Sequence, residues 1–454
     1  METHKNKGLE RKTLMLKRKA QKYLREYFTR NPDKIMIVEG ARQVGKSYII
    51  RETAKEYFTN YIELNFAEDA LGSRLFANVR TTSDFYLRVS MVAGERMGNK
   101  EDTLVFLDEI QEYPEFLTLL KFLRQDARYT YIASGSLLGI TLKKTASIPV
   151  GSVEFLRMYP LDFEEFLYAN GFGEVAVSAL RQKFEARECL DEEMHRRMME
   201  LFRMYLLVGG MPDAVNEYIS TGNVVNFRRV QNDIRRLYED DASKYEKEAS
   251  RKLKIRRIYS MIPSNMENKK KRMVVKDIEG KKGKKYSDYE EEFEYLITAG
   301  IALDVKAVPT PVFPLAETAT KNLLKLYLND VGLLTGVLYQ NNIRAVLDEE
   351  TGVNLGAVYE SVVAQELKAH GHELYYYDNR TKGEVDYLIN DYENLASLPV
   401  EVKSGKDYTV HSALSAFVGN KDYGVKNGIV FSNAREIRTD EKVTYYPVYD
   451  VMFL

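Results

Sequence analysis

The stretch GARQVGKS at residues 40–47 fits the pattern G-x-x-x-x-G-K-[ST] and follows the apolar run IMIV at residues 35–38. Glycines allow backbone N–H groups to close around phosphate oxygens, and the N-terminus of a following helix attracts the same anion. Residues 46–58 have the composition of such a helix. This order predicts a phosphate-binding loop formed by Gly40, Ala41, Arg42, Gln43, Val44, Gly45, Lys46 and Ser47.

In such a loop we expect Lys46 to reach the β- and γ-phosphates of ATP and the Ser47 hydroxyl to bind Mg²⁺. Two acids that could complete the site follow the apolar run at residues 104–107. We expect Asp108 to hold Mg²⁺ through water, and Glu109 to orient or deprotonate the attacking water. Strands often end in acids, so this pair alone is a weak signal. It indicates a nucleotide site only in combination with the loop at residues 40–47.

Ser134 lies at the end of a later apolar run, residues 129–133. A polar side chain at the tip of a strand beside the phosphate loop could sense the γ-phosphate. A plain serine at the junction of strand and turn explains this residue nearly as well, so both interpretations stay open.

Four short apolar runs alternate with helical stretches in the first third of the chain, at residues 35–38, 61–66, 104–107 and 129–133. Short runs of this kind are typical of parallel strands that are buried on both faces. The pattern therefore predicts an α/β fold with a P-loop NTPase core over residues 1–155.

Composition limits the classes of protein that remain. A chain of 454 residues suggests about three domains, and its net charge of −1 excludes a general polycation, so any nucleic-acid contact must come from a local patch. The single Cys189 cannot form an internal disulfide, and the five histidines show no zinc-like spacing. Residues 1–22 lack the apolar core of a signal peptide, and no apolar run reaches the roughly 18 residues of a membrane span. We expect a cytoplasmic protein.

The middle of the chain reads as mostly helical. Helical spacing at residues 161–170, 182–207 and 227–248 predicts a helical lid over residues 156–245. Residues 246–325 are compatible with a winged-helix-like domain. Their basic stretch, residues 269–285, could contact phosphates or simply be a solvated loop. The acidic helix expected after it would repel phosphates, which favours a protein partner over DNA for this region.

The C-terminal part carries a second group of charged residues. Two strand-like runs joined by a polar loop predict a hairpin, with Asp386 on the first run and Glu401 and Lys403 on the second. Glu401 and Lys403 are two residues apart and therefore project from one face of their strand. Carboxylates on adjacent strands can hold a divalent metal, with Lys403 steadying the attacking water. Glu360, on a helical stretch, could add a third carboxylate.

Taken together, these motifs resemble the prokaryotic AAA+-like ATPase family whose C-terminal domain is related to PD-(D/E)xK nucleases. The matching segments are GARQVGKS (40–47), LDE (107–109), SGS (134–136), YPL (159–161), FEEF (163–166), GGMP (209–212), KLY (325–327), DVGL (330–333) and the C-terminal charged residues. The resemblance implies an ATPase core, a helical lid, a winged helix and a restriction-endonuclease-like α/β domain over residues 326–454.

The chain departs from the family pattern at two places. Glu384 stands where the nuclease motif usually has proline, and Gly151-Ser152 stands where many relatives have Gly-Arg. The resemblance implies an oligomer in which an arginine reaches a neighbour's nucleotide. Arg124, Arg128 and Arg157 lie in the region expected for that arginine, and none of them can be singled out.

Two functions remain open at this point. The first is an ATP-binding and ATP-hydrolysing protein that uses Mg²⁺ and couples nucleotide state to a nuclease-like, DNA-binding domain. The second is a nucleotide-dependent switch or scaffold for a protein partner, without nuclease activity. A C-terminal domain that binds DNA ends without cutting them is a weaker third possibility.

Overall fold

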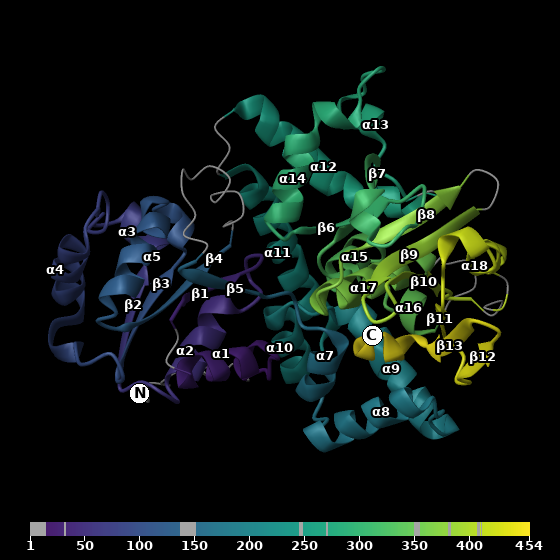
Figure 1. The fold of residues 1–454 in the computed structure, drawn as a ribbon, viewed down its shortest axis with the longest axis horizontal. Coiled ribbons are helices and arrows are strands. Elements are labelled where there is room, and N and C mark those ends of the chain that lie inside the picture. The colour runs from purple at the N-terminus through teal and green to yellow at the C-terminus, as the bar shows by residue number, and fades with distance from the viewer. Residues whose placement is uncertain are drawn as a thin grey trace, which may run out of the picture.

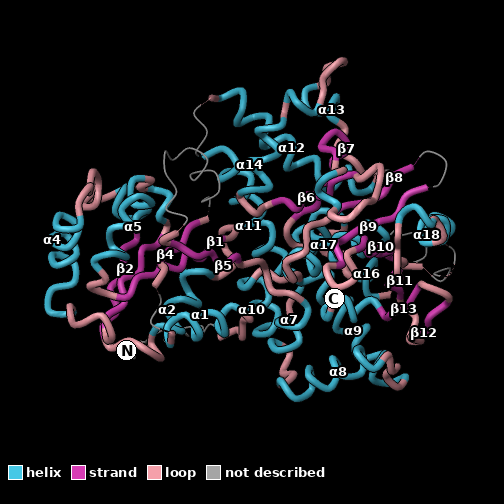
Figure 2. Tube along the Cα trace, in the orientation of Figure 1, coloured by secondary structure: helices cyan, strands magenta, loops and turns pink. Residues whose placement is uncertain are grey.

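The computed structural model describes residues 15–30, 33–136, 151–244, 248–268, 271–348, 355–379, 383–405, 409 and 411–454. Residues 1–14, which include His4, and the first two lysines of the basic stretch lie outside the described residues. Two sheets lie toward opposite ends of the molecule, and helices fill the space between them (Figure 1). The two groups of strands are well separated along the Cα trace (Figure 2).

The N-terminal sheet has five strands in the order β2-β3-β4-β1-β5, and all neighbouring pairs are parallel. Its strands are β1 (Ile35–Glu39), β2 (Asn60–Asn65), β3 (Thr103–Asp108), β4 (Thr130–Gly135) and β5 (Val153–Arg157). Every residue of β3 and β4 is buried, as the continuous apolar runs predict. The predicted α/β, P-loop NTPase-like core is therefore confirmed.

Helices cover both faces of this sheet. Side chains of α1 and α2 pack on one face, and those of α4 and α5 pack on the other. The helices of this region are α1 (Ala20–Thr29), α2 (Lys46–Ala54), α3 (Phe66–Leu71), α4 (Thr82–Ala93) and α5 (Glu115–Asp126). Strand β5 was not expected from the sequence, because it is an edge strand whose burial alternates along the chain.

A mainly helical region follows the sheet. It contains α7 (Phe163–Ala169), α8 (Glu174–Ala186), α9 (Glu192–Val208), α10 (Pro212–Thr221) and α11 (Val224–Lys244). The single helix expected over residues 182–207 is wrong. Arg187 ends α8 in the left-handed conformation, and the Asp191 side chain caps α9 by accepting a hydrogen bond from Met194 N.

The C-terminal sheet has eight strands in the order β12-β13-β11-β10-β9-β8-β6-β7. The predicted hairpin is present as the antiparallel pair β9 and β10, while β10 pairs with β11 in parallel. Helices α17 and α18 pack on opposite faces of this sheet, since their buried side chains belong to different core clusters. The elements are β8 (Tyr375–Asn379), β9 (Gly383–Asp391), β10 (Ala396–Val402), β11 (Gly428–Ser432), β12 (Arg438–Asp440), β13 (Val443–Pro447), α17 (Gly356–Ala369), α18 (Ser412–Val418) and the 3-10 helix η6 (Val448–Phe453).

The expected domain boundaries do not match the strands. The boundary at 155/156 falls inside β5, and that at 325/326 falls inside β7 (Thr320–Leu328). Strand β7 pairs with β6 (Ala302–Ala307), and β6 also pairs with β8. Strand β6, which lies inside the range expected for the winged-helix-like domain, thus belongs to the C-terminal sheet. Local patterns did not reveal this, because the partner strand lies about seventy residues further along the chain.

The remaining helices connect these parts. They are α12 (Ala249–Glu267), α13 (Val275–Glu279), α14 (Glu290–Thr298), α15 (Val331–Leu338) and α16 (Arg344–Leu347). Acids of α14 face bases of α12, and Glu291 forms an ion pair with Arg251 at 2.8 Å. Some of the acidic character of α14 therefore serves this internal contact. Across the part of the chain that the structure describes, no helix combines the length and apolar character needed to cross a membrane.

Candidate functional site

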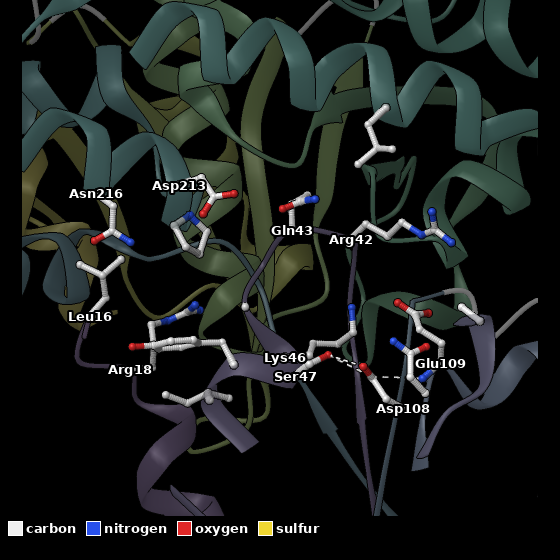
Figure 3. A pocket seen from close by; sticks show the side chains of 17 residues that line it. Leu16, Arg18, Arg42, Gln43, Lys46, Ser47, Asp108, Glu109, Asp213 and Asn216 are labelled. Carbon is white, nitrogen blue, oxygen red and sulfur yellow. Dashed lines mark hydrogen bonds between the residues drawn. The ribbon is translucent and has the colours of Figure 1, made fainter. Parts of the chain in front are cut away.

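A cavity of about 530 Å³ opens at the carboxyl ends of the N-terminal strands (Figure 3). One wall comes from the loop at residues 40–47, from α2 and from residues at the ends of β2 and β3. The opposite wall comes from the N-terminal segment, α10 and α11 and contains Leu16, Arg18, Pro212, Asp213, Asn216 and Leu237. Ligands of open α/β sheets bind outside the carboxyl ends of the strands, so the cavity lies where this fold favours a ligand.

The loop geometry depends on glycine and brings Lys46 into the cavity. Gly40 has φ +151°, and a Cβ atom at this position would collide with the carbonyl oxygen of Met158. Lys46 begins α2, and its Nζ donates to the carbonyl oxygens of Gly40 at 3.0 Å and Ala41 at 2.8 Å. Burial lowers the pKa of Lys46 to about 8. A phosphate would offer this ammonium a stronger partner than two neutral carbonyls.

The expected magnesium ligands lie together beside the loop. Ser47 Oγ donates to both carboxylate oxygens of Asp108 at 2.9 Å, and Ser134 Oγ also donates to Asp108. Burial raises the pKa of Asp108, and the nearby charge of Glu109 adds to the effect. A hydroxyl and a carboxylate in contact are oxygen ligands of the kind that Mg²⁺ prefers, so these residues fit the ion. Ser134 contacts this acid directly, and its contact with phosphate stays a prediction.

Glu109 is held at the edge of the same cavity. Its backbone has φ +54°, and its carboxylate accepts hydrogen bonds from Gln111 Nε2 and, at 3.0 Å, from Ser136 Oγ. Arg42 Nε lies 3.4 Å from Ser136 Oγ. Burial acts to raise the pKa of Glu109, but Lys46 together with Gln111 and Arg42 lowers it overall. The carboxylate is therefore ionised near neutral pH, as a proton acceptor must be.

Several residues around the cavity were missed by sequence reasoning. Gln111 and Ser136 follow β3 and β4, and their position after strands that end at the cavity was the available signal. The segment GGMP at residues 209–212 was noted only as part of the resemblance. In the structure, Gly210 lies so close to Leu161 that a Cβ atom would collide with its backbone, and Pro212 reaches the cavity wall.

Arg18 ties the loop to the helical region. Its guanidinium donates to the carbonyl oxygens of Val44 at 2.8 Å and Tyr159 at 2.7 Å, and to Glu165 Oε2 at 3.0 Å. The side chain is buried and lines the cavity. Arg18 therefore connects the Val44 carbonyl of the loop with Glu165 of α7.

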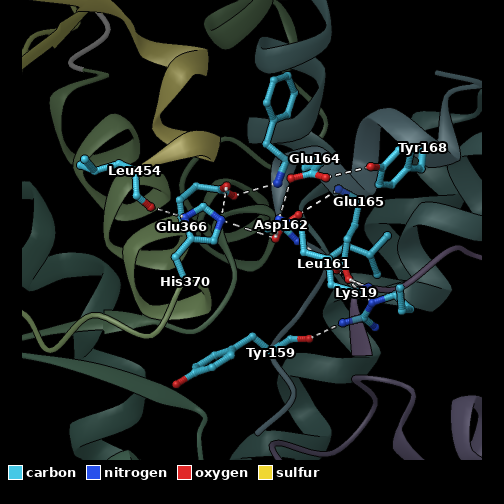
Figure 4. Close-up of polar contacts among 12 residues, drawn as sticks. Lys19, Tyr159, Leu161, Asp162, Glu164, Glu165, Tyr168, Glu366, His370 and Leu454 are labelled. Carbon is cyan, nitrogen blue, oxygen red and sulfur yellow. Dashed lines mark hydrogen bonds and ion pairs between the residues drawn. The ribbon is translucent and has the colours of Figure 1, made fainter. Parts of the chain in front are cut away.

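A buried polar network continues from there to the C-terminal domain (Figure 4). Asp162 binds Lys19 Nζ at 2.7 Å and lies 3.5 Å from Nε2 of His370, on the C-terminal side of α17. Glu366, on α17, accepts hydrogen bonds from Phe163 N and from the Tyr205 hydroxyl, both at 2.9 Å. Burial raises the pKa of Glu366 to about 8, and the charge of Asp162 acts in the same direction.

A second contact joins the same regions. The Asp330 carboxylate accepts hydrogen bonds from Gly210 N at 2.6 Å and from Leu333 N, at the start of α15, at 3.0 Å. Burial raises the pKa of Asp330 to about 6. The YPL, GGMP and DVGL segments, which are far apart in the sequence, therefore meet at one junction beside the cavity.

The charged residues predicted in the C-terminal part also come together. Asp386 Oδ2 accepts a hydrogen bond from Val402 N at 2.9 Å, and Lys403 Nζ lies 2.6 Å from Glu401 Oε1. Burial raises the pKa of Glu401 to about 8 and that of Glu360 to about 7, and in both cases the charge of Asp386 contributes. The charge of Asp386 thus acts on both glutamates, and Glu360, Asp386 and Glu401 are called the carboxylate centre below.

Lysines partner the glutamates of this centre. Lys271, from the basic stretch, forms an ion pair with Glu360, and Glu401 is paired with Lys403. Among the described residues, no three His, Cys, Asp or Glu side chains are already arranged to hold a metal ion. Glu384, which replaces the usual proline, pairs with the fully buried Lys325.

The three candidate arginines are placed as follows. Arg124 binds Asp33, and the guanidinium of Arg128 lies 3.9 Å from the ring centre of Tyr86. The guanidinium of Arg157 lies 5.5 Å from the ring centre of Tyr159. None of the three lines the 530 Å³ cavity. That one of these arginines reaches the nucleotide of a neighbouring subunit therefore stays a prediction.

Three family matches divide the chain. Residues 32–167 match an AAA domain, residues 199–344 match a domain of unknown function (DUF8612), and residues 355–451 match a second domain of unknown function (DUF4143). The sequence matches none of the curated proteins with which it was compared.

Solved structures show distant similarity. The Walker-type ATPase PABY2304 of Pyrococcus abyssi is 14% identical, with a TM-score of 0.43 over 71% of this chain and 95% of that chain. Cdc6p from Pyrobaculum aerophilum is 13% identical, with a TM-score of 0.26 over 74% of this chain and 95% of that chain. The S. cerevisiae Hsp104–ADP complex is 11% identical, with a TM-score of 0.29 over 62% of this chain and 36% of that chain.

The site and the AAA match agree on the same residues. The phosphate loop, the acids after β3 and the parallel sheet all lie within residues 32–167. The chain therefore contains an AAA+-like, P-loop ATPase domain, followed by two regions whose matching families have no assigned function.

Proposed function

We propose that this protein binds and hydrolyses ATP in the cavity beside residues 40–47. The observation that carries the proposal is the contact of Ser47 with Asp108 at 2.9 Å, with Lys46 and Glu109 at the same opening. Bound Mg²⁺ would supply positive charge that offsets the negative charge of the phosphates. Ser47 and Asp108 are the residues that would hold it.

The protein's own groups would then do the following. Backbone N–H groups of the loop and the N-terminus of α2 cradle the phosphates, and Lys46 exchanges its carbonyl partners for phosphate oxygens. Glu109 orients a water molecule and accepts its proton, while Gln111 and Ser136 fix the direction of the carboxylate. Ser134 keeps Asp108 in place.

We further propose that nucleotide state is coupled to the C-terminal domain. The Arg18 contacts to Val44 and Glu165 and the Glu366 contacts to Phe163 and Tyr205 support this. They form a continuous buried route from the phosphate loop to α17, which also carries Glu360. Continuity alone does not create coupling, so a functional readout is required.

The first candidate for the coupled activity is metal-dependent cleavage of DNA. The convergence of Glu360, Asp386, Glu401 and Lys403 supports it, since two or three carboxylates beside a lysine can hold a divalent ion and steady an attacking water. The second candidate is a switch or scaffold for a protein partner. The ion pair of Lys271 with Glu360 favours it, because a lysine takes an oxygen that a metal ion would need.

Cleavage of plasmid and single-stranded DNA by the full chain, with Mg²⁺ or Mn²⁺ and with or without ATP, separates the candidates. Cleavage that is lost in Lys403→Ala would establish the nuclease, and a response to Lys46→Ala would establish control by ATP. Intact DNA under all conditions, together with retained ATP binding, would select the switch or scaffold. Lys284→Ala, at an exposed lysine, is the control.

A further inference from the structure

One carboxylate oxygen of the C-terminal centre lacks a partner. Glu401 is 5% exposed, and its Oε2 atom has no hydrogen-bond partner among the described residues, although Oε1 lies 2.6 Å from Lys403 Nζ. A buried polar atom without a partner destabilises the folded state, and a charged one does so more strongly. Burial raises the pKa of Glu401, and the charges of Asp386 and Glu360 act in the same direction. Carboxylate oxygens are the ligands that divalent cations prefer, so the unpartnered Glu401 oxygen suits such an ion.

The Glu360 side of this centre is already filled by a lysine. Lys271 Nζ forms an ion pair with Glu360 Oε1, and the Tyr327 hydroxyl lies 3.5 Å from Glu360 Oε2. The Lys271 side chain is 18% exposed and that of Glu360 is 6% exposed, so this pair is largely removed from water. Lys271 is therefore the cation in direct contact with Glu360 in this structure, and the charge of Lys325 also acts on this carboxylate.

Lys271 comes from outside the helix and strands that carry the carboxylates. It lies in the segment between α12 and α13. Met273 N in this segment donates a hydrogen bond to Leu324 O of β7 at 3.0 Å. The next residue, Arg272, forms an ion pair with Asp378 on β8. Two successive basic side chains of the stretch thus point into the C-terminal domain, where a solvated or phosphate-binding loop would point them outward.

We propose that Lys271 is a built-in cation of the carboxylate centre and competes with a divalent metal ion for Glu360. An ammonium in contact with Oε1 excludes a metal ion from that oxygen and repels it from the neighbouring one. Metal binding with all three carboxylates therefore requires Lys271 to leave Glu360. Lys403, which pairs with Glu401 from the same strand region, stays available for either state.

The inference rests on the proposed metal-binding role of this centre and is independent of ATP hydrolysis. Mn²⁺ binding to the full chain without nucleotide, measured by calorimetry and by electron paramagnetic resonance, tests it directly. We expect Lys271→Met to bind Mn²⁺ at least about tenfold more tightly than wild type, because the competing charge is gone. The gain should vanish in the double variant Lys271→Met/Glu360→Gln. The exposed Lys284→Met should match wild type.

Removal of one partner from a buried ion pair destabilises a protein, so a second measurement guards against misfolding. Lys271→Gln keeps a polar group of smaller size, and Mn²⁺ should raise the unfolding temperature of this variant more than that of wild type. Glu360-dependent Mn²⁺ binding of equal affinity in wild type and Lys271→Met would overturn the competition alone. No Mn²⁺ binding by any variant would overturn the metal centre, and with it the nuclease candidate.

Discussion

Lys46 in the nucleotide cavity and Lys271 in the C-terminal centre are both shielded lysines, but their partners differ. Lys46 donates to two neutral carbonyl oxygens of its own loop, beside a cavity of about 530 Å³. Lys271 is paired with the carboxylate of Glu360. A phosphate that binds would give Lys46 a charged acceptor in place of neutral carbonyls. A metal ion that binds to Glu360 would instead have to displace Lys271.

A sequence motif can therefore predict which residues form a site without predicting which ion or ligand binds to them. The GARQVGKS loop contains its own lysine, so the whole phosphate-binding arrangement is local in sequence. The D…E-x-K arrangement depends on residues from a helix and two strands, and a further residue from a distant segment can enter it. We therefore expect substitutions at the nucleotide site to change ligand binding and catalysis, and those at buried ion pairs to change stability.

The largest expected effect is on hydrolysis at the first centre. Glu109→Gln keeps the shape of the side chain but removes the proton acceptor, and loss of a general base slows catalysis by roughly 10²–10⁴-fold. ATP affinity should stay near the wild-type value, because Lys46 and Ser47 are unchanged. Phosphate release and equilibrium binding of ATP, measured on the same preparation, check both parts. A variant that hydrolyses ATP at the wild-type rate would remove Glu109 from the mechanism.

Lys46→Ala should weaken ATP binding by about a hundredfold, which corresponds to about 3 kcal/mol for the lost charge-assisted hydrogen bonds. Lys121→Ala, at an exposed lysine of α5, is the control and should bind ATP like wild type. Fluorescent-nucleotide titration measures both. Equal affinities in the two variants would show that the cavity does not bind phosphates through this loop.

The junction between the two centres should show a pH signature. Burial raises the pKa of Asp330 from 3.8 to about 6, so the folded state binds more protons than the unfolded state between these values. Stability from this group is therefore lost as pH rises through that window. Relative to Asp330→Asn, the wild type should lose on the order of 3 kcal/mol between pH 4 and pH 7.

Urea unfolding at several pH values, followed by circular dichroism, measures that difference. A constant difference between wild type and Asp330→Asn across this range would contradict the assigned pKa of Asp330 and its cause.

The smallest expected effect is the loss of folding stability when a buried lysine that serves only as an ion-pair partner is replaced. Lys325 is fully buried and pairs with Glu384, and its Nζ lies 4.4 Å from the ring centre of Tyr376. Lys325→Met should lower stability by about 2 kcal/mol, less than for a fully buried pair, because Glu384 keeps some contact with water. Lys46→Met should change stability by less than about 1 kcal/mol without nucleotide, since only hydrogen bonds to two neutral carbonyl oxygens beside an open cavity are lost. Thermal unfolding compares the two, and equal losses would remove the distinction between the centres.

Much of the nucleotide site could be predicted from the sequence because its signals are local. The apolar runs became β1 to β4, and the residues expected around Lys46 and Asp108 are in contact. Gln111 and Ser136 could not be assigned, because their roles arise only when β3 and β4 lie side by side. Leu16 and Pro212 line the cavity from segments outside the loop and the sheet, and no local pattern assigns them to the site.

The C-terminal centre was predicted less completely for the same reason. Asp386, Glu401 and Lys403 follow from the β9–β10 hairpin, and Glu360 joins them through packing of α17. The pairing of β6 with β8 and the entry of Lys271 are long-range contacts without a local pattern. The basic composition of residues 269–285 suggested outward-facing charge, whereas the first described residues of that stretch, Lys271 and Arg272, pair with the buried Glu360 and the half-buried Asp378.

The most direct test of the account is hydrolysis of γ-labelled ATP by the wild-type full chain, with enzyme in excess over nucleotide, in Mg²⁺ and in EDTA. We expect release of labelled phosphate in Mg²⁺, none in EDTA, and none from Lys46→Ala under the same conditions. ATP that stays intact in Mg²⁺ while bound to the wild-type chain would contradict hydrolysis at this site. Phosphate release that Lys46→Ala retains would place the activity elsewhere.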